Sequence, residues 1–129
     1  SVDLRNSTDA LVDQMAAEVQ AYAAALASKT GLSIQFELVS SYPAQVFHKE
    51  CVDAVAKAAQ ALGYSNMPAV SGAGHDAVYM ARLAPTGMIF IPCKDGVSHN
   101  EIEDAKTVHL EAGANVLLHS MLRFAKPIL

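Results

Sequence analysis

Apolar residues recur every three or four positions in the first part of the chain, as on one face of an α-helix. The stripe consists of Leu11, Met15, Val19, Tyr22 and Leu26. Helix-capping residues precede it at Asn6, Ser7 and Thr8, and Asp9 suits the positive end of a helix. Gly31 suits the left-handed position that ends a helix. The pattern predicts a helix from about residue 9 to about residue 28.

Alternating apolar and polar positions predict strands on both sides of this helix. Residues 1–4 alternate, and the second run has apolar residues at Leu32, Ile34, Phe36 and Leu38. Such alternation is typical of a half-buried strand. Residues 1–39 therefore form a predicted βαβ piece, which is too small to build a good core alone. It starts as though the chain had been cut inside a strand.

The remainder of the chain predicts a second α/β unit after a linker at residues 40–43. An alanine-rich helix is expected over residues 46–62, and Gly63 ends it. Short buried strands are expected at 67–70 and 88–92, with a helix between them that ends near residue 83. A last helix is expected from residue 101 or 106 to 124. Gly113 inside it costs about 1 kcal/mol relative to alanine, which indicates a close packing contact.

Composition narrows the class of protein. The 129 residues suit one domain-sized chain, with 52% hydrophobic residues, 17% charged residues and a net charge of -4. These values exclude a disordered tail, and the absence of a basic stripe argues against nucleic-acid binding. The sequence has no apolar run long enough for a membrane span, and residues 1–5 lack the pattern expected of a secretory signal. Cys51 and Cys93 form no disulfide framework, so we expect two buried thiols in a reducing cytoplasm.

The candidate chemistry lies on two loops and one arginine. His99 follows the predicted 88–92 strand, where α/β proteins place their sites, and Glu101 or Glu103 could orient it as a metal ligand. The alternative is a helix N-cap at Ser98 with an incidental histidine. No H-E-x-x-H, C-x-x-C or G-x-S-x-G pattern occurs, so spacing alone gives neither a complete metal site nor a serine nucleophile.

The glycine-rich segment 71–77 (Ser-Gly-Ala-Gly-His-Asp-Ala) could present backbone N–H groups to an anion or a carbonyl oxygen. The alternative is a tight turn in which Asp76 caps a helix. Arg5 could hold a carboxylate with two parallel hydrogen bonds, or it could be a surface residue that pairs with Asp3 or Asp9. The other histidines, His48, His109 and His119, are expected on helix surfaces or satisfied in the core.

Four ordered segments together resemble one enzyme group. They are Ser71–Ala77, Met80-Ala81, Pro85–Pro92 and Gly96–His99. The sequence resembles the C-terminal part of N-carbamoyl-L-amino-acid hydrolases, allantoate amidohydrolases and β-alanine synthase, within the dinuclear zinc aminoacylase/carboxypeptidase superfamily. The implied fold is α/β: half of a ferredoxin-like βαβ lid, followed by the C-terminal α/β segment of a zinc-hydrolase catalytic domain. Residues 1–44 would belong to the lid and dimerisation domain, and residues 45–129 to the catalytic domain.

The resemblance also implies roles for individual residues. His99 matches the last metal ligand, Arg5 matches the lid arginine that binds the substrate carboxylate, and Gly74 and His75 match a loop that contacts the substrate. His75 is thereby a candidate catalytic residue. The implied cofactors are two divalent metal ions, Zn or Mn, whose other ligands would lie upstream. The implied assembly is a cytoplasmic homodimer through the lid.

In the resembled enzymes, a metal-activated water attacks the ureido carbonyl, and the products are an amine, ammonia and carbon dioxide. Because one ligand cannot hold two metal ions, we expect this chain alone to be inactive, as a fragment of a larger hydrolase. Two alternatives remain open: an aminoacylase or dipeptidase of the same superfamily, and a non-catalytic α/β binding or dimerisation module.

Overall fold

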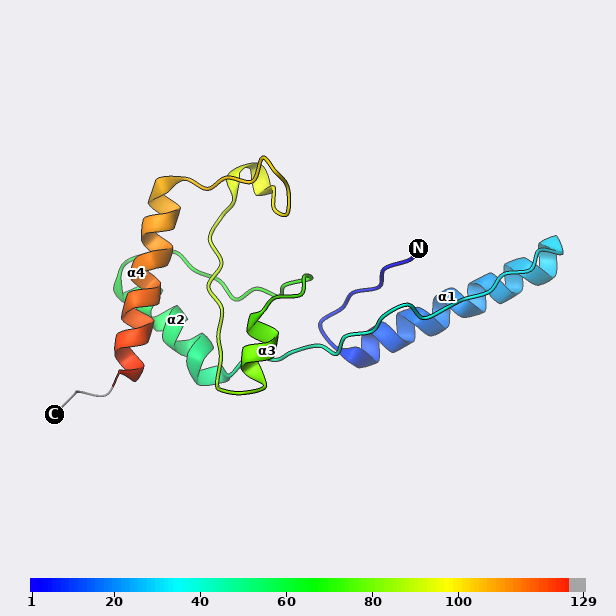
Figure 1. Cartoon of the computed structure of the whole chain (residues 1–129), viewed down its shortest axis with the longest axis horizontal. Helices are drawn as coiled ribbons and strands as arrows, with labels where there is room; N and C mark the ends of the chain where they lie inside the picture. The colour runs from blue at the N-terminus through cyan, green and yellow to red at the C-terminus, as the bar shows by residue number, and fades with distance from the viewer. Residues whose placement is uncertain (126–129) are drawn as a thin grey trace. The chain divides into compact units, whose positions relative to one another are not determined.

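The computed structural model describes residues 1–125 as helices joined by extended segments and turns (Figure 1). The elements, in chain order, are α1 (Asp9–Thr30), α2 (Lys49–Ala61), α3 (Ala77–Ala81), the 3-10 turn η1 (Lys94–Gly96) and α4 (Thr107–Phe124). The chain divides into two compact units. The first combines Ser1–Gln45 with Val70–Gly74, and the second combines Val46–Ala69 with the chain from His75 onward.

The first unit contains the long helix α1, and its limits confirm the predicted helix. Thr8 is the N-cap, where its Oγ1 accepts a hydrogen bond of 3.4 Å from the Leu11 N–H. Gly31 adopts the left-handed conformation with φ 75° and donates its N–H to the Ala27 carbonyl at 2.9 Å. Ala23 is the one buried residue of α1 among the described residues, and Tyr22 is 73% exposed. Local capping, rather than burial, therefore accounts for the position of this helix.

The predicted strand at residues 32–38 is wrong, as is the one at 1–4. No strand forms among residues 1–125, and the four apolar residues of the second run (Leu32, Ile34, Phe36 and Leu38) are all exposed. After Gly31 the chain instead runs back along α1 (Figure 1), and the Ala44 N–H donates to the Asp9 carboxylate at 2.7 Å. A strand requires a neighbouring strand to pair its N–H and C=O groups, and the described residues of this unit provide none. The βαβ piece of the predicted lid is therefore not formed.

The second unit has its core between α2 and α4, which pack against each other. The buried residues Ala58, Ala59 and Val116 form this core, and Val55, Leu62, Tyr64 and Ile89 pack around it. Alanine side chains on α2 allow the two helices to approach closely. These helices confirm the predicted ones at 46–62 and in the 101–124 region, while α3 is shorter than expected. The strands predicted at 67–70 and 88–92 do not form, because the described residues give them no partner strand.

Two glycines of the second unit lie where an added side chain would crowd a neighbouring segment. A Cβ on Gly113 of α4 would lie 2.7 Å from Ile91 Cγ2, which confirms the close packing contact predicted at this position. A Cβ on Gly87 would lie 3.0 Å from Cys51 Cβ on α2. The extended segment around residues 87–91 is therefore held against both helices, and Met88, Ile89 and Ile91 are half-buried on it.

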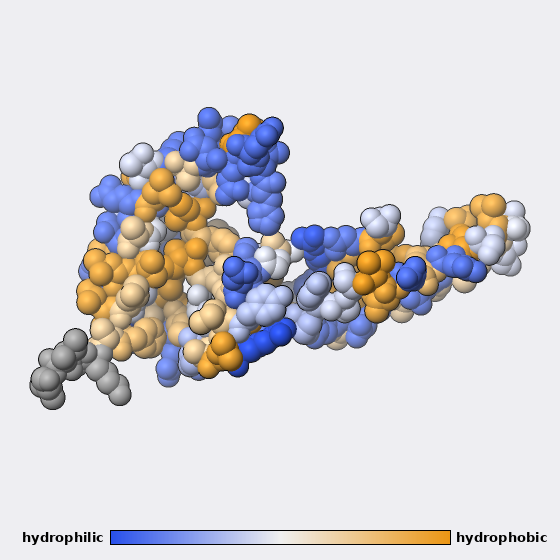
Figure 2. Space-filling view, in the orientation of Figure 1, coloured by the Kyte–Doolittle hydropathy of each residue, from blue (hydrophilic) through white to orange (hydrophobic). Residues whose placement is uncertain are grey.

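An open, largely apolar cavity of about 510 Å³ lies beside these contacts. Its lining includes Ile89, Ile91, Leu117, Met121 and Phe124. Hydrophobic side chains gather on the visible face of the region that contains α4 (Figure 2), and both Leu117 and Met121 are more than half exposed. Within residues 1–125, no helix combines the length and the hydropathy that a membrane span needs.

Candidate functional site

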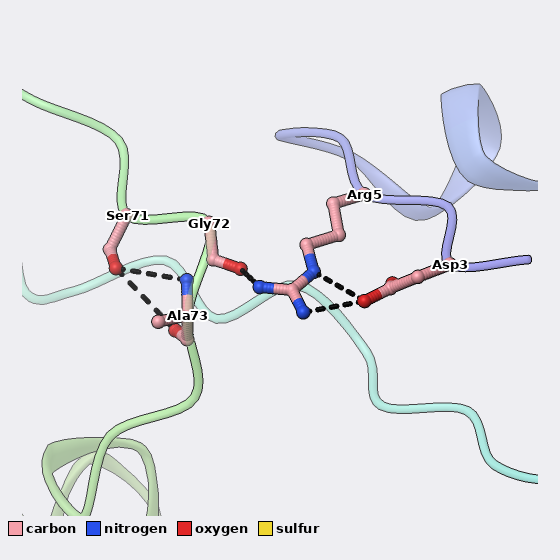
Figure 3. Close-up of polar contacts among 5 residues, drawn as sticks. All are labelled: Asp3, Arg5, Ser71, Gly72 and Ala73. Atoms are coloured by element: carbon pink, nitrogen blue, oxygen red, sulfur yellow. Dashed lines mark hydrogen bonds and ion pairs between the residues drawn. The ribbon is translucent and has the colours of Figure 1, made fainter. Parts of the chain in front are cut away.

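The Arg5 side chain makes three hydrogen bonds within the first unit. Its Nε and Nη2 donate to one oxygen of Asp3, at 3.0 and 2.5 Å, and its Nη1 donates to the Gly72 carbonyl at 2.6 Å (Figure 3). All three residues belong to the first unit. The pairing with Asp3 is the surface contact that the sequence left open as an alternative. The bond to Gly72 joins segments 67 positions apart, and no pattern in the sequence indicated it.

The charges of this pair act on each other although both side chains are largely exposed, at 60% for Arg5 and 65% for Asp3. The hydrogen bond from Arg5, assisted by its positive charge, lowers the pKa of the Asp3 carboxyl. The same hydrogen bond and the Asp3 charge raise the pKa of the Arg5 guanidinium. The pair is therefore fully ionised at neutral pH. Because water screens exposed ion pairs, its contribution to stability is small, and its main effect is on the orientation of Arg5.

The glycine-rich segment divides between the two units. In the first unit, Ser71 Oγ accepts from the Ala73 N–H at 3.1 Å, which shapes the turn (Figure 3). A Cβ on Gly74 would meet no atom within 4 Å, so this position is open to a ligand.

In the second unit, His75 and Asp76 lead into α3. The His75 ring is half-buried and meets Phe90 edge-on, with centroids 5.5 Å apart and an interplanar angle of 62°. Asp76 lies at the N-cap position, but its side chain makes no capping hydrogen bond. Asp76 therefore occupies the capping position that the sequence offered for it, but without a side-chain hydrogen bond to the helix. Phe90 packs against one side of the His75 ring, and the sequence did not predict this contact.

His99 lies on an exposed loop with unusual backbone geometry. Its φ is 55°, a left-handed conformation that is uncommon for a residue other than glycine. Its N–H donates to Glu103 Oε2 at 2.7 Å, and the Glu103 N–H donates to the Asn100 carbonyl at 2.9 Å. Glu103 thus holds the backbone of His99, whereas the sequence suggested that a carboxylate would orient the ring. The alternative of a helix capped by Ser98 is wrong, because α4 begins at Thr107.

The described residues do not assemble a metal centre. Across residues 1–125, no three His, Cys, Asp or Glu side chains come close enough together to hold a metal ion. A zinc site needs at least three protein ligands, and these residues supply no such group around His99. Of the predicted site residues, Arg5 and Gly74 belong to the first unit, and His75 and His99 to the second.

The other histidines and the two cysteines are not among the predicted site residues. His48 is exposed at the N-cap position of α2, and His109 Nδ1 lies 3.4 Å from the Pro92 carbonyl oxygen. His119 is exposed on α4. Cys51 and Cys93 are free thiols, as predicted, but both are only half-buried.

Comparison with known proteins gives consistent matches over nearly the whole chain. Residues 5–123 match peptidase family M20/M25/M40. The chain is 42% identical to an N-carbamoyl-L-amino-acid amidohydrolase of Rhizobium meliloti, over 98% of this chain and 30% of that protein. It is 32% identical to a ureidoglycolate hydrolase of Arabidopsis thaliana, over 90% of this chain and 25% of that protein.

A solved structure gives the same result. A hydantoinase/carbamoylase family amidase from Burkholderia multivorans superposes with a TM-score of 0.91 at 48% sequence identity. The match covers 95% of this chain and 30% of the amidase. The chain therefore matches a fragment of the carbamoylase-family fold, and it spans less than a third of the length of these relatives.

Proposed function

Because the chain belongs to peptidase family M20/M25/M40, we propose that it forms part of an amidohydrolase that cleaves the ureido C–N bond of N-carbamoyl-L-amino acids or allantoate. The observation that carries this proposal is the 42% identity, over 98% of the chain, to an N-carbamoyl-L-amino-acid amidohydrolase. Hydrolysis of such a bond yields the amine, ammonia and carbon dioxide. The ureidoglycolate hydrolase among the relatives supports the same class of bond.

In this proposal Arg5 binds the substrate carboxylate. The guanidinium carries five N–H donors in one plane, and its geometry matches the two oxygens of a carboxylate. The side chain of Arg5 remains 60% exposed while it is held by Asp3 and Gly72, so it is both oriented and accessible. A carboxylate bound at Arg5 would fix one end of the substrate and leave the ureido group to the reacting groups.

Gly74 and His75 are proposed to contact the substrate near the scissile bond. The absence of any atom within 4 Å of a Gly74 Cβ supports close approach of a ligand to the backbone there. The His75 imidazole can donate a hydrogen bond to the oxygen that gains negative charge when the carbonyl is attacked. Its edge-on contact with Phe90 packs one side of the ring, which supports a role as a positioned donor.

His99 is proposed as one metal ligand of the complete enzyme. The residues described here do not by themselves fit a metal pair, because no second and third ligand lie beside His99 in the described part of the chain. Zn or Mn would need further ligands from sequence that this chain does not span. We accordingly propose that the 129-residue chain alone is inactive.

Residues 1–44 are proposed to form part of a lid through which two subunits associate. Leu32, Leu38 and Val39 support this idea, because their exposed fractions are 63%, 81% and 87%. Burial of such residues against a partner would remove apolar surface from water. Light scattering of the full-length protein, with Leu38→Asp as the variant, tests this part. A dimer that persists unchanged in that variant contradicts a lid interface at this segment.

Ammonia release by the full-length protein tests the proposed reaction. The substrates are N-carbamoyl-L-amino acids and allantoate, with the matching N-acetyl amino acids as the comparison. Because hydrolysis of an N-acetyl amino acid releases acetate and not ammonia, turnover of these compounds is measured as release of the free amino acid. Turnover of the ureido compounds alone supports the proposal. Preference for the N-acetyl compounds would support the second candidate, an aminoacylase or dipeptidase, which the peptidase description of the family favours. No turnover of either, with no metal bound, would support a non-catalytic module.

A further inference from the structure

We infer that Asp3 is a positioning residue that orients Arg5 for the substrate carboxylate. The inference rests on the proposed function, because it assumes that Arg5 binds that carboxylate. Beyond that function, Asp3 gains a role of its own, and one edge of the Arg5 guanidinium is assigned to the ligand. The three hydrogen bonds of Arg5 carry the argument (Figure 3).

A guanidinium group has three hydrogen-bonding edges, which together present five N–H donors. The Nε–H and one Nη2–H share one edge, and both donate to the same oxygen of Asp3. The outer N–H of Nη1 points to the side of Cδ. Gly72 lies on that side, because a Cβ on Gly72 would be 3.9 Å from Arg5 Cδ, and its carbonyl accepts from Nη1 at 2.6 Å.

These contacts leave the third edge for a ligand. It consists of the second N–H of Nη1 and the second N–H of Nη2, which point in the same direction. Two parallel donors of this kind match the two oxygens of a carboxylate. Asp3 and Gly72 therefore do not compete with a substrate for this edge, and instead they fix the plane in which it lies.

Asp3 aids binding only if its ordering of the Arg5 side chain outweighs its repulsion of the substrate carboxylate. Asp3 is itself an anion, so it also repels a substrate carboxylate. That repulsion acts across the guanidinium, in a site that is largely exposed to water and salt, where it is screened. An unheld arginine, in contrast, must lose the freedom of its long side chain each time a ligand binds. We therefore expect removal of the Asp3 carboxylate to weaken binding.

Steady-state kinetics of the full-length protein separates the two effects. Asp3→Ala removes both contacts to Arg5, Asp3→Asn removes the charge but keeps an acceptor oxygen, and Asp3→Glu keeps the carboxylate. We expect KM for an N-carbamoyl-L-amino acid to rise about two- to fivefold in Asp3→Ala, less in Asp3→Asn and least in Asp3→Glu, with kcat changed little. KM for the corresponding N-carbamoyl amino acid amide, which lacks the carboxylate, should not change.

The matched control is Asp13→Ala, which removes an exposed carboxylate from α1 without touching Arg5. Its KM should equal that of the unmodified protein. Equal or lower KM in both Asp3→Ala and Asp3→Asn would overturn the inference, because repulsion would then dominate. A rise of the same size for the amide substrate would also overturn it, since it would indicate a general structural role.

Arg5→Ala distinguishes this inference from the proposal on which it rests. If Arg5→Ala leaves KM for the carboxylate substrate unchanged, the proposed role of Arg5 fails, and the inference fails with it. If Arg5→Ala raises KM while the Asp3 variants do not, Arg5 keeps its role and the inference about Asp3 alone is overturned. A rise in Arg5→Ala together with the expected order of the Asp3 variants supports both.

Discussion

The two units stabilise their helices in different ways. In the first unit, α1 has a side-chain N-cap at Thr8 and a left-handed C-cap at Gly31, yet only Ala23 is buried on it among the described residues. In the second unit, α2 and α4 have no side-chain hydrogen bond at their N-caps, but they share a buried core. The difference shows that a helix can be specified either by signals at its own ends or by the surface against which it packs.

The two units should also respond differently to substitution, one mainly in ligand binding and the other mainly in folding. The polar contacts of Arg5 in the first unit are exposed, so changes there should alter binding more than folding. The glycines at 87 and 113 in the second unit sit against other segments, so changes there should alter folding directly. The variants at Ala54, Gly113 and Thr8 each perturb one unit, and a matched variant in the other unit serves as the reference.

The largest effect is expected from Ala54→Asp in α2. Ala54 is 1% exposed, and a carboxylate at this position would be buried without a partner, at a cost of about 3 kcal/mol or more. We expect peptides from α2 and α4 to lose protection from hydrogen exchange, measured by mass spectrometry. Ala24→Asp, on an exposed position of α1, is the control and should leave that protection unchanged. Retained protection in Ala54→Asp would contradict the burial of this position on α2.

A smaller loss of stability is expected from Gly113→Ala in α4. The added methyl group would lie 2.7 Å from Ile91 Cγ2, and Ile91 is β-branched and cannot easily move away. Overpacking lowers the free energy of unfolding by about 1–3 kcal/mol, whereas the higher helix propensity of alanine raises it by about 1 kcal/mol. The net effect is a modest destabilisation. The urea midpoint of the second unit should fall.

The matched control for Gly113→Ala is Gly74→Ala, which places its methyl group in open space. This variant should leave the midpoint unchanged while it weakens substrate binding in the full-length protein. If Gly113→Ala instead raises the midpoint, helix propensity outweighs the contact with Ile91.

A still smaller effect is expected from Thr8→Ala at the start of α1. Loss of an N-cap side chain costs about 0.5–2 kcal/mol of stability. Because the hydrogen bond from the Leu11 N–H to Thr8 is long, at 3.4 Å, we expect a loss near the lower value of this range. Backbone chemical shifts should report fraying of the first turn of α1. Lys106→Ala at the N-cap position of α4 is the comparison, since Lys106 makes no side-chain capping bond. Equal fraying in both helices would contradict the contrast between the units.

The smallest effect concerns the exposed pair of Lys49 and Asp53 on α2, at 2.6 Å. The hydrogen bond from Lys49 lowers the pKa of the Asp53 carboxyl from its ordinary value of 3.8. Because the folded-state pKa is depressed, the pair stabilises the fold fully above that ordinary value, and this stabilisation is lost as the pH falls through the lowered pKa. In Lys49→Gln, the NMR titration midpoint of Asp53 should rise toward 3.8. An unchanged midpoint would show that the pair does not persist in solution.

Particular residues show how far sequence reasoning extends. Thr8 and Gly31 fix the ends of α1 through bonds to residues three or four positions away, so their roles could be predicted. Gly113 could be predicted as a packing contact, because a glycine inside a helix is costly without one, but its partner Ile91 could not. The strand at residues 32–38 was predicted from alternation alone and is not formed. Alternation describes which face would be buried, whereas pairing depends on a neighbouring strand.

For the candidate site, too, the sequence predicted some features and the structure alone showed others. The resemblance to carbamoyl-amino-acid hydrolases pointed to Arg5, Gly74, His75 and His99, and the comparisons confirm the family. The roles of these four residues stay predictions. The hydrogen bond of Arg5 to Gly72 and the contact of His75 with Phe90 join positions far apart in the chain, and no local pattern encodes them.

The sequence by itself determined the longer helices, the capping residues of α1 and the family, because these depend on interactions or motifs within short stretches of chain. Only the tertiary structure decided that Asp3 and Gly72 hold Arg5, that Ile91 fills the space beside Gly113, and that the apolar alternating segment after α1 stays unpaired. The physical reason is that such contacts depend on which distant backbone or side-chain groups come within a few ångströms, and residue spacing along the chain does not fix those distances.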